Sequence, residues 1–114
     1  MLNPEDEAVP LLAESTRIFL EIGDPLYVAT NLCRFARVLA VDGRAEPAAQ
    51  VLARAELGHE EIGLAIDPWL VTFNHETRVL IHAGLDDAAY ADASTRGRKL
   101  TNDEAVALAL NELE

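Results

Sequence analysis

Two His-Glu pairs, at positions 59–60 and 75–76, are the first residues here whose types could do chemistry. Each begins like the helical zinc motif, in which a second histidine follows four residues after the first, but neither pair has that second histidine. His75 and His82 lie seven residues apart on one helical face, yet Arg78 between them would repel a metal cation. We therefore predict no metal site, and a solvated polar face in preference to a shared ligand site.

Other catalytic arrangements are also missing. Cys33 falls on the apolar arc of its predicted helix with no histidine near it in sequence, which favours a packed core cysteine over a nucleophile. The acidic runs at 5–7, 60–61 and 86–87 suit helix starts or a charged surface. The six glycines stand singly, so no phosphate-binding loop is present. Without a linked nucleophile, base and oxyanion donor, we predict a protein that is not an enzyme and needs no cofactor.

Six polar residues on two predicted helices form a constellation that suggests binding. They are Asn31, Arg34, Arg37, Asn74, Arg78 and His82. If both helices face one groove, the guanidinium groups would pair with carboxylates and the amides with peptide backbone. The expected partner is a protein or peptide segment. The alternative is that these residues are only the polar halves of amphipathic helices.

The elements that must position these residues repeat along the chain. The segment RVLAVDG at 37–43 returns as RVLIHAG at 78–84, and the same offset of 41 residues carries Leu32 onto Phe73. Each copy is predicted to end a helix at its glycine. A helical repeat near 40 residues is typical of a solenoid. We therefore predict an all-α fold over residues 1–114, a single domain of antiparallel helix pairs stacked as a short solenoid.

Apolar periodicity and turn residues predict six helices in this solenoid. Their expected ranges are Pro4–Ile22, Pro25–Val41, Glu46–Ile62, Pro68–Ala83, Asp86–Arg96 and Asn102–Leu113. Asp24 and Asp67, each followed by proline, are expected to cap the second and fourth helices. In the fourth helix we expect Trp69 and Leu80 to be buried, and Asn74 to face outward.

The end of the chain carries its own boundary signals. Gly97 is predicted to end the fifth helix. Thr101 and Glu104 have the spacing of a capping box, in which the threonine oxygen and the glutamate carboxylate satisfy free backbone amides. We expect the last helix to cap the C-terminal end of the stack.

The first predicted helix has more apolar surface than one neighbour would cover. Besides its main apolar stripe, which includes Leu11 and Ile18, it carries a second patch of Val9, Ala13 and Leu20. Only two repeats are present, where three or more are usual. We therefore expect Val9, Ala13 and Leu20 to form an interface, either in a homodimer through this helix or with a larger parent protein.

Charge and hydropathy exclude two classes of partner. Nine basic against 20 acidic residues leave a net charge of −11, which opposes direct nucleic-acid binding. No apolar run approaches the roughly 20 residues of a membrane span, and residues 1–7 are acidic where a signal peptide would be basic and then apolar. We expect a cytoplasmic protein without membrane contact, which the single cysteine suits.

The spacing of large and small residues in the first repeat resembles the tetratricopeptide (TPR) pattern. The matching residues are Leu32, Phe35, Ala36, Leu39, Gly43, Ala48, Leu52 and Ala55. Small residues let two helices approach closely, and the leucines fill the space between pairs. The second copy departs from the pattern at Glu76 and Arg96, and the period exceeds the 34 residues of a TPR unit.

Residues 91–110 resemble the closing segment of large actinobacterial-type regulators, A-x-A-x-x-x-G-R-x-L-[ST]-x-x-E-A-V-x-x-A-L. Those proteins join an ATPase module to a helical-repeat region, often with a LuxR-type DNA-binding or a nucleotide-cyclase domain. The resemblance implies that this chain is the terminal piece of such an array or a small relative. The ATPase, cyclase and helix-turn-helix motifs themselves are absent from the sequence.

These observations predict a non-catalytic protein-protein interaction module, part or relative of a bacterial signalling or transcriptional regulator. The alternative is an effector-sensing domain of such a regulator that binds a small molecule. An enclosed, partly apolar pocket near Arg34 and Arg78 would favour this alternative, and an open shallow groove would count against it.

Overall fold

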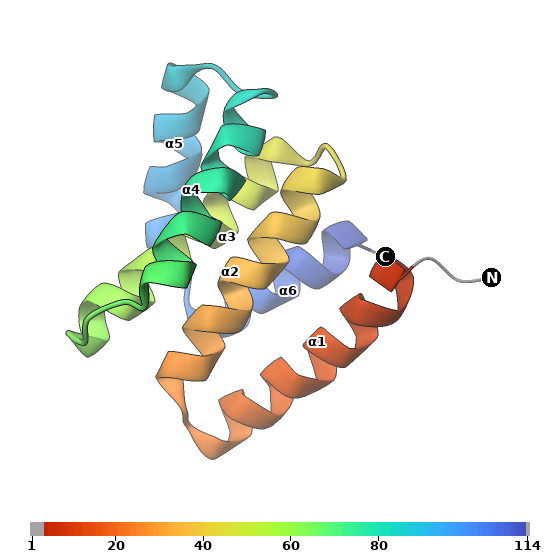
Figure 1. The fold of residues 1–114 in the computed structure, drawn as a ribbon, viewed down its shortest axis with the longest axis vertical. Coiled ribbons are helices and arrows are strands. Elements are labelled where there is room, and N and C mark those ends of the chain that lie inside the picture. The colour runs from red at the N-terminus through yellow and green to blue at the C-terminus, as the bar shows by residue number, and fades with distance from the viewer. Residues whose placement is uncertain (1–3, 114) are drawn as a thin grey trace.

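The computed structural model describes the backbone of residues 4–113 and the side chains of residues 8–113, and these residues form six α-helices (Figure 1). The helices are α1 (Pro4–Ile22), α2 (Pro25–Val41), α3 (Ala45–Ile62), α4 (Pro68–His82), α5 (Asp87–Arg98) and α6 (Asn102–Leu113). No strand occurs among residues 4–113, so the predicted all-α class is confirmed. Residues 1–3 and the side chains of the acidic run 5–7 lie outside the described part.

The centre of the fold is the pair α2 and α3. Their facing sides supply most of the large fully buried side chains, including Leu32, Phe35, Leu39, Val51 and Leu52. The chain reverses between them at Gly43, which has a left-handed φ of 80°. The N–H of Arg44 then donates to the carbonyl of Leu39 at 2.9 Å, which closes the end of α2.

The two copies of the repeated segment end differently. Both α2 and α4 stop two residues before their glycines, at Val41 and His82. Gly43 needs its positive φ for the turn, whereas Gly84 does not have one. A Cβ on Gly84 would instead meet the Cβ of Ala45 at 3.0 Å. The first glycine therefore serves backbone geometry and the second serves close packing.

Helix α5 lies against α3 and makes few contacts with α4. Gly97, predicted to end this helix, lies inside it, because α5 continues to Arg98. It is buried where α5 crosses the backbone of α3 at Gln50. Its role is therefore to allow this close crossing.

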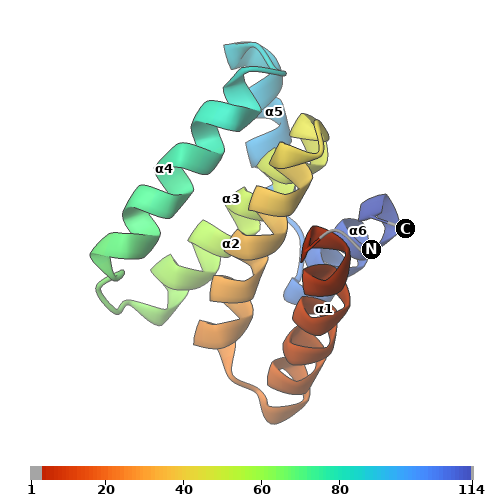
Figure 2. The same cartoon turned by 45° about the vertical axis from the view of Figure 1, so that its right-hand side comes forward.

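Helix α6 packs against α3, α2 and α1, beside α1 in the view of Figure 2. The prediction that it caps the C-terminal end of the stack is wrong, because α6 packs mainly on α1, α2 and α3 and not on α4 and α5, the two helices before it in the chain. Its Ala105, Val106 and Ala109 are buried in the core of the central helices. Its start is as predicted. The N–H of Thr101 donates to Glu104 Oε1 at 2.9 Å, and the N–H of Glu104 donates to Thr101 Oγ1 at 3.1 Å, so the capping box is confirmed.

Helix α1 flanks α2 and contains Pro10 within its span. The residues predicted to form its uncovered patch are turned inward: Ala13 and Leu20 pack against the core, and Val9 is half-buried. The outward apolar residues are Leu11, Ile18 and Ile22. The expected interface residues are thus corrected, because the helix is rotated so that part of its main apolar stripe faces out.

Helix α4 lies on the side of α2 away from α1 (Figure 2). The inward face of α4 is built from Leu70, Asn74, Thr77 and Ile81, spaced three or four residues apart. Trp69 and Leu80, predicted to be buried, are therefore exposed. No helix among the described residues is long and apolar enough to span a membrane.

Candidate functional site

The six predicted binding residues do not come together in one groove. Asn31 is buried between α1 and α2, where its amide Nδ2 donates to Thr16 Oγ1 at 3.1 Å and to Ser15 Oγ at 3.2 Å. Its outward placement in the prediction was wrong. The amide satisfies the hydroxyl groups that α1 brings into the interface, so it holds α1 and α2 together.

Arg37 joins α2 to α4. Its Nε donates to Thr77 Oγ1 at 2.8 Å, its Nη2 donates to the carbonyl of Phe73 at 2.7 Å, and its guanidinium lies 4.0 Å from the centre of the Phe73 ring. These contacts use the guanidinium within the fold. Arg37 is thus a link between helices.

Asn74 points into the core beside Cys33. Its Nδ2 lies 3.4 Å from Cys33 Sγ, and its Oδ1 is buried without a hydrogen-bond partner among the residues that the structure describes. Burial raises the pKa of the Cys33 thiol from 9.0 to about 11. The thiol therefore stays protonated and in the core, which agrees with the packing role predicted for Cys33.

Arg78 and His82 occupy two separate places. Arg78 Nη1 donates to Glu56 Oε1 at 2.9 Å, so this arginine links α4 to α3. His82, at the far end of α4, lies over Tyr90 with ring centres 4.3 Å apart, and its Nδ1 is 3.8 Å from Asp87 Oδ1. Neither residue reaches the site described next.

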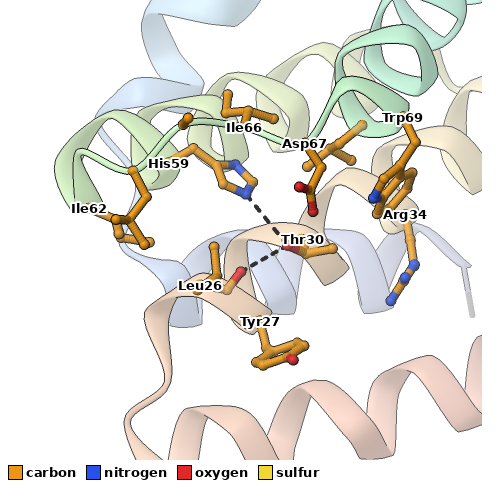
Figure 3. Close-up of a pocket in the computed structure, with 12 residues that line it drawn as sticks. Leu26, Tyr27, Thr30, Arg34, His59, Ile62, Ile66, Asp67 and Trp69 are labelled. Atoms are coloured by element: carbon orange, nitrogen blue, oxygen red, sulfur yellow. Dashed lines mark hydrogen bonds between the residues drawn. The ribbon is translucent and has the colours of Figure 1, made fainter.

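A pocket of about 320 Å³ lies where the start of α2, the end of α3 and the start of α4 meet (Figure 3). We call it the hollow. Helix α2 contributes Leu26, Tyr27, Thr30 and Arg34; α3 and the following loop contribute His59, Ile62, Leu64, Ala65, Ile66 and Asp67; α4 contributes Trp69 and Leu70. Of the six predicted residues, Arg34 is the one that lines it.

His59 provides a buried acceptor at the wall of the hollow. Only 5% of this residue is exposed. Its Nδ1 lies 3.1 Å from the carbonyl of Ala55, and because a carbonyl only accepts, Nδ1 carries a proton. When the ring carries this one proton, the other nitrogen, Nε2, is an acceptor. Its neighbour at 3.5 Å is Thr30 Oγ1, whose single proton already serves the carbonyl of Leu26 at 3.0 Å.

Asp67 provides a second acceptor. The N-cap aspartates of α2 and α5, Asp24 and Asp86, both accept a hydrogen bond from a backbone N–H of their helix. The side chain of Asp67 makes no such bond to α4. It lines the hollow instead, and Figure 3 shows its carboxylate on the same side of the space as the His59 ring.

The remaining wall is apolar and aromatic. Trp69 is 48% exposed and lies with Tyr27, Leu26, Leu64 and Ile66 around the opening. Tyr27 stacks on Phe19 of α1, with ring centres 4.7 Å apart and planes 13° apart, which holds the tyrosine in place. The hollow therefore combines an apolar rim with the buried ring of His59, the half-buried hydroxyl of Thr30 and the exposed carboxylate of Asp67.

In the described part of the chain, no three His, Cys, Asp or Glu residues gather in a metal-binding arrangement. The chain matches no protein-family model, no curated protein and no solved structure. The assignment of a function therefore depends on the chemistry of the hollow.

Sequence reasoning missed most of this site. His59 was considered only for zinc, Asp67 only as a helix cap, and Trp69 only as core. The Asp-Pro pairs at 24–25 and 67–68 look alike in sequence. The difference between them arises because the loop before α4 turns the second aspartate toward α2, a contact that no local pattern encodes.

Proposed function

We propose that this protein is a non-catalytic interaction module that binds a segment of another protein at the hollow. The observation that carries the proposal is the cluster of exposed apolar side chains around a pocket of about 320 Å³, which includes Tyr27, Leu64 and Trp69. Exposed aromatic and aliphatic groups around a concavity are typical of contact sites, where a partner side chain fills the pocket and the rim excludes water.

The architecture proposed with this function is a short TPR-like array in a bacterial signalling or transcriptional regulator. Its support is the run of helices with short connections, together with the structural roles of the closing segment. Ala93 and Gly97 are buried against α3, and Ala105 and Ala109 are buried in the core, so the small residues of the motif sit at close helix contacts. Genomic context with an upstream ATPase module would support this assignment.

A second candidate is the sensing of a small effector by the same hollow. The favouring observation is its size, which falls at the lower end of the range for small-molecule pockets. It adjoins Arg34, as this alternative predicted, but not Arg78. The two candidates differ in their ligand: the effector hypothesis requires a free small molecule to bind as tightly as any peptide.

Self-association through α1 is a separate proposal, now assigned to other residues. Leu11, Ile18 and Ile22 are exposed and, at spacings of seven and four, lie along one face of the helix. A second copy of α1 could cover this face by packing against it, because the same patch would meet itself across a two-fold axis.

The experiment for the interaction function is a selection of random peptides displayed on phage against the purified protein. Affinities of the selected peptides are then measured through the fluorescence of Trp69, the only tryptophan of the chain. Leu64→Ala should weaken them at least about fivefold, a loss of about 1 kcal/mol. Leu11→Ala is the matched control, since the two leucines are 63% and 67% exposed. Failure to select any peptide, or equal loss in both variants, would refute the proposal.

A further inference from the structure

We propose that the hollow binds a primary ammonium group, supplied by a lysine side chain of the partner segment. This inference rests on the proposed function, which makes the hollow the contact site. The partner is thereby assigned a chemistry: a basic segment whose lysine enters the hollow between α2 and the loop that precedes α4.

The polar groups inside the hollow accept hydrogen bonds. Nε2 of neutral His59 accepts because Nδ1 donates to Ala55. Thr30 Oγ1 has lone pairs to offer because its proton is used by Leu26. Asp67 brings a carboxylate that does not cap its helix. An ammonium group has three donors and no acceptor, so its hydrogen-bonding capacity matches three such groups.

The walls of the hollow suit the rest of a lysine side chain. Four methylene groups would lie along the apolar lining formed by Leu26, Ile66 and Trp69. The indole face of Trp69 also attracts a cation. An uncharged apolar side chain would fill the same volume but would donate no hydrogen bond to His59 Nε2, whose neighbour Thr30 Oγ1 is 3.5 Å away, and would bring no positive charge to the Asp67 carboxylate.

The charge of the whole protein favours a basic partner. With 20 acidic and nine basic residues, the protein attracts positively charged segments over long distances and repels acidic ones. A lysine-bearing segment would therefore be steered toward the surface before its side chain enters the hollow.

One positive group lies at the edge of the hollow, and it is held elsewhere. Arg34 Nη1 donates to Asn31 Oδ1 at 2.9 Å, and its guanidinium carbon is 6.0 Å from the centre of the Trp69 ring. Figure 3 shows the guanidinium pointing away from His59. If Arg34 were the recognition group, the ligand would be an anion. Binding of an anion would be weakened more by Arg34→Gln, and binding of an ammonium group more by Asp67→Asn.

The test uses the selected peptides and changes one ammonium group at a time. Each lysine of a peptide is replaced by norleucine, which keeps the stem and removes the charge. We expect one such replacement to weaken binding at least about tenfold. Asp67→Asn should weaken the lysine peptide similarly and leave the norleucine peptide unchanged, as a double-mutant cycle measures. Asp87→Asn is the control, since it changes the net charge equally on a fully exposed side chain.

Several outcomes would overturn the inference while leaving the interaction function in place. Selected peptides that depend on Leu64 but contain no lysine would do so, as would equal binding of the lysine and norleucine forms. A larger loss from Arg34→Gln than from Asp67→Asn would assign the site to an anion. If free pentylammonium ion, measured through the fluorescence of Trp69, binds with the same affinity as the peptide, the ligand is a small amine and not a lysine of a partner segment. Selection of no peptide at all would instead contradict the proposed function itself.

Discussion

Gly97 of α5 lies directly on the backbone of Gln50 in α3. A Cβ placed on this glycine would be 2.7 Å from the Cα of Gln50 and would also overlap its carbonyl oxygen. Neither atom is at the end of a flexible side chain, so neither can move without shifting a helix. The distance between α3 and α5 is therefore set by the absence of one methyl group.

Gly97→Ala should destabilise the fold by about 1 to 3 kcal/mol, even though alanine has the better helix propensity by about 1 kcal/mol. Gly58→Ala is the comparison, because its new Cβ would meet side-chain atoms and no backbone, the Cβ of Ala29 at 3.2 Å and Nη2 of Arg54 at 4.0 Å. Gly58→Ala should lower the free energy of unfolding less than Gly97→Ala does, or leave it unchanged. Urea unfolding followed by circular dichroism measures both, and equal effects would contradict the close crossing.

Arg37→Ala should destabilise the protein more than Arg78→Ala. Arg37 makes two short hydrogen bonds to α4 and stacks on Phe73, so its loss should cost about 2 kcal/mol. Arg78 makes a partly exposed ion pair with Glu56, worth about 1 kcal/mol or less. Chemical denaturation measures the free energy of unfolding of both variants. A larger loss in Arg78→Ala than in Arg37→Ala would show that other residues link α2 to α4.

Ile18→Glu should change self-association, whereas Leu20→Glu should change the stability of the fold. Ile18 is exposed, so a charge there should leave stability nearly unchanged and abolish any dimer formed through α1. Leu20 packs on the core, so its replacement should lower the free energy of unfolding by about 2 kcal/mol or more. Light scattering over a concentration series reports the dimer. A wild-type protein that is monomeric at every concentration would refute self-association.

Stability should fall as pH rises between 9 and about 11, and Cys33 should contribute to the fall. Burial raises the pKa of this thiol from 9.0 to about 11, so over this range the unfolded chain loses the proton that the folded chain keeps. The contribution of Cys33, about 1 to 3 kcal/mol, is complete below pH 9 and lost as pH rises through the folded pKa. Cys33→Ala should reduce the slope, which isolates the thiol from other groups titrating there.

Local signals in the sequence predicted the helices because those signals act over a few residues. The start and end of α1 and α2, the capping box at Thr101 and the burial of Cys33 followed from periodicity, turn residues and hydropathy. The sequence did not predict correctly which faces of α1 and α4 turn inward. Leu11 and Leu20 are equally apolar, and which of them turns inward depends on the neighbours that α2 and α6 present.

The sequence by itself determined the all-α class, the approximate helix boundaries and a strongly acidic surface charge, since each follows from residue type and short-range spacing. Tertiary structure alone decided where the polar residues act. Asn31 and Asn74 lie buried in helix interfaces. Arg37 and Arg78 donate hydrogen bonds to residues of other helices. Asp67 lines the hollow and does not cap its own helix. The physical reason is that a side chain's partner across an interface is set by how whole helices pack, which no single helical pattern specifies.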